Sequence, residues 1–178
     1  MDKALKYALV TVGALVGAGV LAVLLGLMLP RRHVAVTTAV LDRPVGEVWL
    51  AISDMESQAA WRSDLKGVKR LPDHAGHPVW MQKTDMGDWP LEVTEVSPPV
   101  WLVAAVADSS QGFGGTWTYE LLALRAGTRV TITERGFIDS PFYRFLAWFV
   151  FGLHASQETF LRDLGRHFGE SVKPMKQV

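Results

Sequence analysis

The sequence predicts an α+β domain in which a curved antiparallel sheet of about seven strands surrounds a long C-terminal helix, preceded by one N-terminal transmembrane helix. Three observations carry this prediction. A charge-free apolar run opens the chain, short alternating segments separated by Gly and Pro fill its middle, and an aromatic-rich helical pattern closes it. These features divide the chain into an anchor (1–32), a domain (33–172) and a C-terminal tail (173–178).

The opening run has the composition of a membrane anchor. From Tyr7 to Pro30 there is no charged residue, and most of the run is Leu, Val, Ala and Gly. A helix of about 20 such residues spans a bilayer. A cleaved signal peptide is the alternative, but its apolar core would be only about 7–15 residues long and would end in small residues. This run is longer and ends in Leu-Pro-Arg-Arg, which favours an uncleaved single-pass anchor.

Basic residues flank the anchor almost evenly, with Lys3 and Lys6 before it and Arg31, Arg32 and Arg43 after it. Cytoplasmic flanks of membrane helices carry the excess of Lys and Arg. The small excess after the run therefore leans toward a cytoplasmic domain.

A possible homodimer contact lies inside the anchor. Gly13 and Gly17 form one GxxxG pattern, whose spacing lets two helices approach closely. The same pattern occurs by chance in Gly-rich spans, so it is a weak indication of dimerisation.

The overall composition excludes several classes of protein. With 18 basic and 18 acidic residues, the chain is not built to neutralise nucleic-acid phosphates. It has no cysteine, so disulfides, thiolate metal sites and cysteine catalysis are excluded. It has seven tryptophans, a residue that often lines cavities and interfaces because its N–H needs a partner when buried.

The middle of the chain predicts an antiparallel meander. His33 to Leu41 is β-branched and alternating, as expected for a strand, and "DRPVGEVWLAISD" and "MESQAAW" predict two short helices after it. Parallel strands would need crossovers of a dozen residues or more, which the short loops do not allow. The six further strands are expected at Gly67–Leu71, Val79–Thr84, Leu91–Val96, Trp101–Ala107, Thr116–Leu124 and Arg129–Phe137.

One long helix is expected from about Ser140 to Glu170, and it alone is long enough to cover the sheet. Its large apolar residues recur at intervals of three and four between Phe142 and Leu164, so they share one face. That face is expected to pack into the curve of the sheet, with Phe145 and Phe149 lining a cavity.

The opposite side of the first half of this helix is also aromatic. Tyr143, Trp148 and Phe151 lie there, where no part of the sheet is expected to cover them. Amphipathic aromatic rings favour the headgroup level of a membrane. These three residues are therefore the candidates for a membrane interface or for the mouth of the cavity.

Three segments carry a family resemblance: "DRPVGEVWLAISDMESQAAWRSDLKGVKRL", "GGTWTYELLALRAGTRVTITERG" and "SPFYRFLAWFVFGLHASQETFLRDLGRHFGE". Together they resemble the START-like helix-grip superfamily (SRPBCC), also called the polyketide cyclase/dehydrase and lipid-transport superfamily. The resemblance covers about residues 33–170 and is strongest to small bacterial members with an N-terminal membrane helix. It implies an apolar cavity between sheet and helix, a bacterial inner-membrane location, and a lipid, sterol, polyketide or hormone as ligand. A minority of the family catalyse cyclisation or dehydration, and no segment here is a catalytic signature.

Strand alternation selects the side chains that would line such a cavity. In "GTWTYEL", Trp117 and Tyr119 share the apolar face, and in "TRVTITERG" the face of Ile132 also carries Glu134. A buried carboxylate needs a partner or a raised pKa. Glu134 would therefore hydrogen-bond a ligand, or else pair with an arginine or sit at the open end of the sheet. The second interpretation is favoured because buried charges are usually paired.

Trp61 and Trp80 complete the candidate lining. Trp61 follows a short helix of the kind that rims such a cavity, and Trp80 lies on an alternating strand. Each alone is more typical of core packing than of a binding site, because most buried aromatic residues serve packing. The set together is better evidence than any member.

No catalytic, metal or cofactor site is predicted. Asp73, His74 and His77 lie close together in "PDHAGH", but this Gly/Pro loop has too few ligands nearby for a metal ion. The expected function is a membrane-anchored domain that binds a hydrophobic small molecule or lipid. One alternative is a cyclase or dehydratase that uses Glu134 or Tyr119 as acid or base. Another is a module with a filled core whose aromatic patch docks a partner protein.

Overall fold

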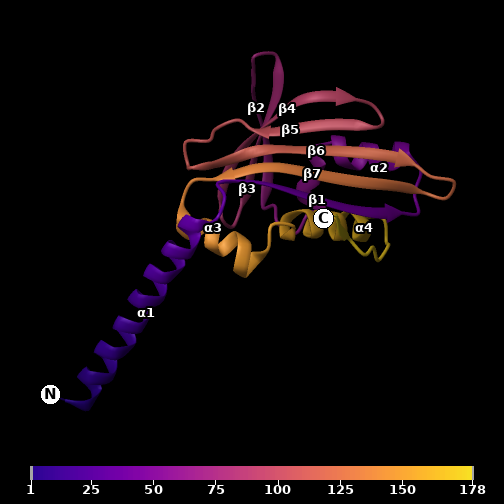
Figure 1. The fold of residues 1–178 in the computed structure, drawn as a ribbon. Helices are drawn as coiled ribbons and strands as arrows, with labels where there is room; N and C mark the ends of the chain where they lie inside the picture. The colour runs from indigo at the N-terminus through magenta and orange to yellow at the C-terminus, as the bar shows by residue number, and fades with distance from the viewer. Residues whose placement is uncertain (1, 178) are drawn as a thin grey trace.

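The computed structural model describes residues 2–177 as one projecting N-terminal helix followed by an antiparallel sheet with helices packed against it (Figure 1). The helical elements are α1 (Lys3–Met28), α2 (Val45–Ser53), η1 (Ser57–Ala60), α3 (Pro141–Phe145), η2 (Leu146–Phe151) and α4 (Ala155–His167). The strands are β1 (Arg32–Leu41), β2 (Gly67–His74), β3 (His77–Thr84), β4 (Gly87–Ser97), β5 (Trp101–Val106), β6 (Phe113–Ala123), β7 (Thr128–Ile138) and β8 (Met175–Gln177).

The sheet has the strand order β2-β3-β4-β5-β6-β7-β1-β8. Consecutive strands from β2 to β7 are neighbours, so the predicted meander is confirmed. β1 then pairs with β7, from Arg32 opposite Phe137 to Leu41 opposite Thr128. β8 adds an eighth strand along β1, so three residues of the segment expected to be a tail belong to the sheet.

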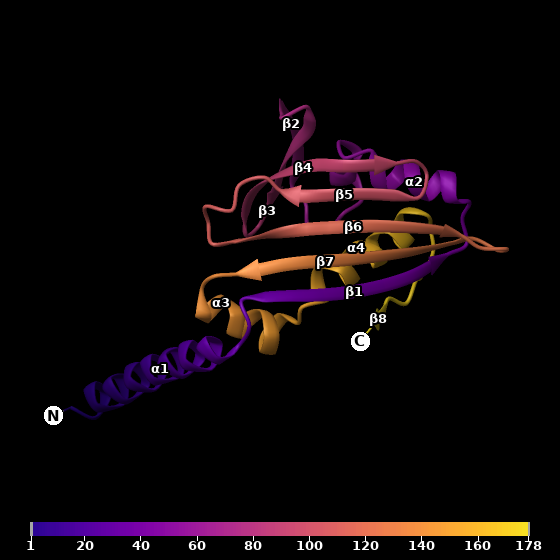
Figure 2. The ribbon, with the colours of Figure 1, turned by 45° about the horizontal axis from the view of Figure 1, so that its top comes forward.

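α1 projects away from the sheet in both views (Figures 1 and 2). It is long and apolar enough to cross a membrane. Its side chains are exposed almost throughout, and its two buried residues, Ala22 and Gly26, lie near its C-terminal end. There the helix packs against α3. At Gly13 and Gly17 no other atoms come near the open side of the helix.

The prediction of one long C-terminal helix is wrong, because the helical segment changes its hydrogen-bonding pattern once and is then interrupted. α3 passes into the wider π-helical turns of η2, and Gly152 then ends the helix with φ +84° and ψ +137°. Only glycine adopts such a conformation readily, since it has no Cβ. α4 begins three residues later, so Phe142 and Leu164 lie on separate helices and share no face.

The hydrophobic core lies between α4, α2 and one face of the sheet. We call this the inner face, the one that carries Tyr119 and Ile132. Phe160, Leu161 and Leu164 of α4 are completely buried against it. α2 contributes three further apolar residues to the same core, Val48, Trp49 and Ile52.

Candidate functional site

Three of the predicted lining residues gather around one side chain of α4. Phe160 lies 5.4 Å from Trp61, 5.4 Å from Tyr119 and 6.2 Å from Trp117, measured between ring centroids. These four rings pack on one another in the hydrophobic core between α4 and the sheet. Tyr119 is only 2% exposed, and burial raises the pKa of its phenol well above the ordinary value of 10.0. Its hydroxyl therefore stays protonated and serves as a neutral polar group.

Four aromatic side chains of the inner face, one of which is Trp117, are covered less well than Phe160 and Tyr119. Trp80, Trp89, Phe113 and Trp117 are all half-buried, and we call this set the aromatic surface. Strand pairing places Trp80 beside Leu91 on the inner face, and Trp89 packs edge-on against Phe113 at 4.6 Å. Among the strands, α4 makes its main contacts with β1.

Two buried N–H groups on this side have no hydrogen-bond partner within residues 2–177. They are Trp61 Nε1 and Gln82 Nε2. Gln82 follows Trp80 by two residues and pairs with Trp89 across the strands, so it shares the inner face. A buried donor without a partner costs about 1–3 kcal/mol, and native structures usually supply a water or a bound molecule. Gln82 was not predicted, because the sequence did not show which face of the strand carries Trp80, two residues earlier.

Glu134 lies on the inner face, as alternation predicted, but its partner is His33 and not an arginine. His33 Nε2 is 3.2 Å from Glu134 Oε1, and the two side chains are 7% and 21% exposed. His33 stands opposite Gly136 on β7. A Cβ on Gly136 would collide with the His33 ring, so the glycine makes room for the imidazole. His33 was missed because nothing in the sequence shows that β1 pairs with β7.

A second histidine lies on the same part of the inner face, at the start of α4. Gln157 Nε2 donates to the Ala35 carbonyl at 3.0 Å, which turns Gln157 Oε1 toward the Thr37 hydroxyl at 2.5 Å. Since the Thr37 proton goes to Gln157, His154 Nδ1 donates to Thr37 Oγ1 across 3.0 Å. Burial first, and then Lys176, lower the pKa of His154 below 6.5 against the opposing effects of Glu158 and Glu134.

The neutral His154 ring therefore keeps Nε2 as an acceptor. We call His33, Glu134, Thr37 and His154 the polar cluster. It can accept and donate hydrogen bonds at the end of the inner face that is nearest to α1.

The remaining predicted residues lie elsewhere. Phe145 and Phe149 pack on each other at 5.3 Å, and Phe149 is 63% exposed. Because the helix breaks at Gly152, the structure does not bring them to the rings around Phe160. Tyr143, Trp148 and Phe151 are exposed on α3 and η2.

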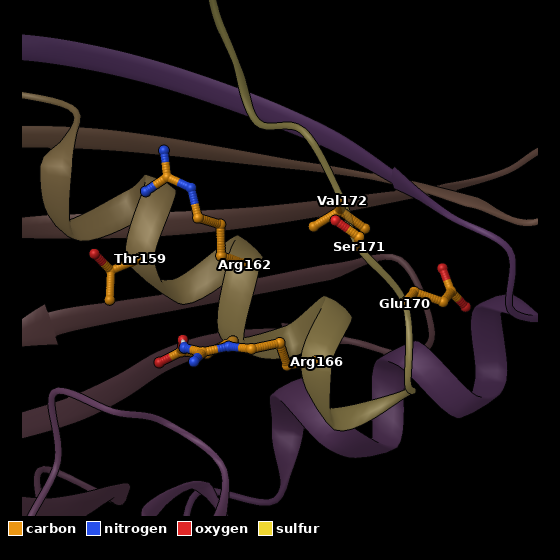
Figure 3. A pocket seen from close by; sticks show the side chains of 7 residues that line it. Thr159, Arg162, Arg166, Glu170, Ser171 and Val172 are labelled. Carbon is orange, nitrogen blue, oxygen red and sulfur yellow. Dashed lines mark hydrogen bonds and ion pairs between the residues drawn. The ribbon is translucent and has the colours of Figure 1, made fainter.

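Two hollows in the surface lie apart from the inner face. One, of about 440 Å³, lies between α4 and the segment after it (Figure 3), and the other, of about 500 Å³, lies at the end of α1. The first is lined by Thr159, Arg162, Asp163, Arg166, Glu170, Ser171 and Val172. Its arginines already pair with Glu158 and Asp163, and its Glu170 pairs with Arg43, so it offers no uncompensated charge to a ligand. The second is lined by Arg31, Arg32 and Phe137.

Comparison with solved structures decides the fold. The Zhui aromatase/cyclase from Streptomyces sp. R1128 superposes with a TM-score of 0.63 over 75% of this chain and 91% of that one, at 14% identity. A START superfamily protein from Mycobacterium smegmatis gives 0.62 over 76% and 96%, at 14% identity. This chain has the START-like helix-grip fold.

The other comparisons agree with this fold and do not identify a function. Norcoclaurine synthase from Thalictrum flavum superposes on this helix-grip domain with a TM-score of 0.60 over 76% of this chain and 93% of that one, at 5% identity. No family model and no curated protein matches the sequence. Identities this low establish the helix-grip architecture alone, because one fold hosts many functions.

Proposed function

We propose that this chain is a membrane-anchored protein whose helix-grip domain binds a hydrophobic small molecule or lipid against the inner face of its sheet. The observation that carries the proposal is the combination of half-buried aromatic rings with two buried N–H donors that have no hydrogen-bond partner within residues 2–177. Ligand sites in proteins have this mixed lining, mostly apolar with a few polar groups that fix orientation.

The parts of the inner face suggest how such a ligand would lie. The aromatic surface offers rings to the apolar body of the ligand. Trp61 Nε1 and Gln82 Nε2 would donate to an acceptor on it, and Glu134 would accept from a hydroxyl or amine. Trp61 and Trp80 both pack against the apolar core as well, so the same side chains hold the domain together and face the ligand.

The anchor part of the proposal rests on α1. Its apolar length fits a bilayer, and a tethered domain needs little diffusion to exchange an apolar ligand with the membrane. We infer a bacterial inner-membrane location, and the small excess of basic residues after α1, at positions 31, 32 and 43 against Lys3 and Lys6 before it, favours the cytoplasmic side for the domain. Homodimerisation through Gly13 and Gly17 stays a prediction.

A second candidate function is an enzyme of the cyclase or dehydratase kind. The pair formed by His33 and Glu134 favours it, because an imidazole beside a carboxylate can accept a proton from a substrate and hold it as imidazolium. The two residues are 101 positions apart, so the sequence alone did not indicate that they form a pair. If the bound molecule is converted, the product and not the starting compound would accumulate on the protein.

Native mass spectrometry of the full chain, carried from its own membrane into nanodiscs, tests the proposal. We expect a co-purifying apolar molecule at close to one per protein, and its identification would give the ligand class. Trp80→Ala should reduce its occupancy severalfold, whereas Trp101→Ala should not. Trp101 is a matched control because it lies on the same sheet and pairs with Glu120 on the outer side. An empty protein, or a bound protein in place of a small molecule, would contradict ligand binding and support the partner-docking alternative.

A further inference from the structure

A run of exposed apolar side chains lies on α3 and η2. Six large side chains of this region are 39–63% exposed: Phe142, Tyr143, Trp148, Phe149, Val150 and Phe151. No residue of η2 is buried among the residues that the structure describes. We call this set the η2 patch. Contiguous apolar surface of this kind on a folded domain marks a binding surface for a protein or a membrane.

The η2 patch is attached to the end of α1. Gly26 of α1 lies so close to Pro141 of α3 that a Cβ there would collide with the Pro141 carbonyl. Ile138 N donates to the Arg31 carbonyl at 2.9 Å, and Arg31 forms an ion pair with Asp139. Figures 1 and 2 show α3 and the turns after it beside the end of α1. The patch and the end of α1 therefore form one continuous apolar unit.

Arg144 is the only charged residue between Phe142 and Phe151, and its side chain is turned away from the η2 patch. Arg144 is 6% exposed. Its Nη1 donates to the Leu29 carbonyl at 2.7 Å, and its Nη2 lies 3.4 Å from the Asp139 carbonyl. A charge at membrane depth is tolerated when backbone carbonyls or an opposite charge satisfy it. Arg144 thus links α1 to α3 without placing its charge on the exposed apolar surface.

We propose that the η2 patch inserts into the same leaflet of the bilayer in which α1 ends. Pro141 packs at Gly26, which precedes Arg31 by five residues and Arg32 by six, and the charges of these arginines belong at the headgroup level. At this depth an aromatic segment lies at the boundary of headgroups and acyl chains. The bilayer is the occupant that continuity with α1 selects, in preference to a soluble partner or a second copy.

Insertion would fix the orientation of the whole domain. With α1 and η2 both held in lipid, the end of the inner face that carries the polar cluster would face the membrane surface. This inference rests on the anchor part of the proposed function and extends it, because a ligand would then pass between bilayer and sheet without crossing water.

The absence of cysteine makes a direct test available, since single cysteines can carry a nitroxide spin label. Three variants of the full chain, Phe151→Cys, Leu15→Cys and Leu122→Cys, would be labelled in vesicles of phosphatidylcholine and phosphatidylglycerol. Leu15 lies in α1, and Leu122 is an exposed apolar residue of β6 distant from the anchor. Collision rates with oxygen and with a nickel chelate then give the depth of each label.

We expect the label at 151 about 5–10 Å below the phosphates, with the label at 15 deeper and the label at 122 in water. A label at 151 in water, with 15 in lipid, would overturn insertion and leave the anchor standing. A label at 151 that is immobile but no deeper than the one at 122 would mean that protein covers the patch, and would overturn insertion too. A label at 15 in water would overturn both the insertion of the η2 patch and the membrane anchor. Tyr143→Cys repeats the measurement if Phe151→Cys does not fold.

Discussion

His33 and Glu134 lie on the paired strands β1 and β7, with Nε2 and Oε1 3.2 Å apart on the inner face. They are offset by two residues in the strand pairing, since His33 faces Gly136 and Glu134 faces Ala35. The small residues opposite each of them leave space for both side chains. The strand pairing therefore holds the His33 and Glu134 side chains together. Several measurements can establish the roles of this pair and of the residues around it.

Glu134→Gln should weaken binding of a dansyl-labelled long-chain alcohol about tenfold, because a hydrogen bond to a charged acceptor contributes about 1.5–3 kcal/mol. Energy transfer from the tryptophans to the dansyl group would report binding to the full chain in nanodiscs. Glu120→Gln is the matched control, since Glu120 is an exposed carboxylate of β6 opposite Thr131. Equal affinities for the two variants would remove Glu134 from the ligand site.

The pKa of His154 predicts a dependence of stability on pH. Because its folded-state pKa lies below 6.5, the folded protein binds fewer protons than the unfolded chain. Its contribution to stability is fully present above pH 6.5 and is lost as the pH falls from there through the folded pKa. Thermal unfolding followed between pH 7.5 and pH 5 should thus show a steeper decrease for the wild type than for His154→Gln. Parallel curves would mean that the burial of His154 carries no such linkage.

Phe160→Ala should lower the free energy of unfolding by about 3–5 kcal/mol, because it opens a cavity at the centre of the aromatic cluster. Phe160 is 0% exposed, while Phe151 is 60% exposed on η2. Phe151→Ala should change stability in detergent by no more than about 0.5 kcal/mol. Chemical unfolding monitored by tryptophan fluorescence compares the two. Similar losses would show that η2 is part of the folding core.

Gly152→Ala should destabilise the domain by about 1–3 kcal/mol, because an L side chain is strained at φ +84° even though the space around it is open. Gly46→Ala offers the opposite case. Gly46 lies within α2 in equally open space with no positive φ, so alanine there should stabilise the helix by about 1 kcal/mol. Unfolding temperatures of both variants check the pair. If Gly152→Ala is neutral, the helix break has another cause than the glycine backbone.

The sequence by itself determined the elements that depend on local pattern. Twenty-odd uncharged residues are enough to predict α1, and alternation is enough to predict the strands and to turn Tyr119 and Glu134 inward. These features follow from the periods of helix and strand, which nearest neighbours in the chain already express.

Only the tertiary structure decided which side chains meet. His33 and Glu134 are 101 positions apart and come together because β1 returns to the edge of β7. Trp61, from a loop, meets Phe160 across the core, and Gly152 breaks a helix that apolar periodicity alone would continue. Contacts between distant segments depend on strand order and on single backbone conformations, and neither leaves a periodic trace in the sequence.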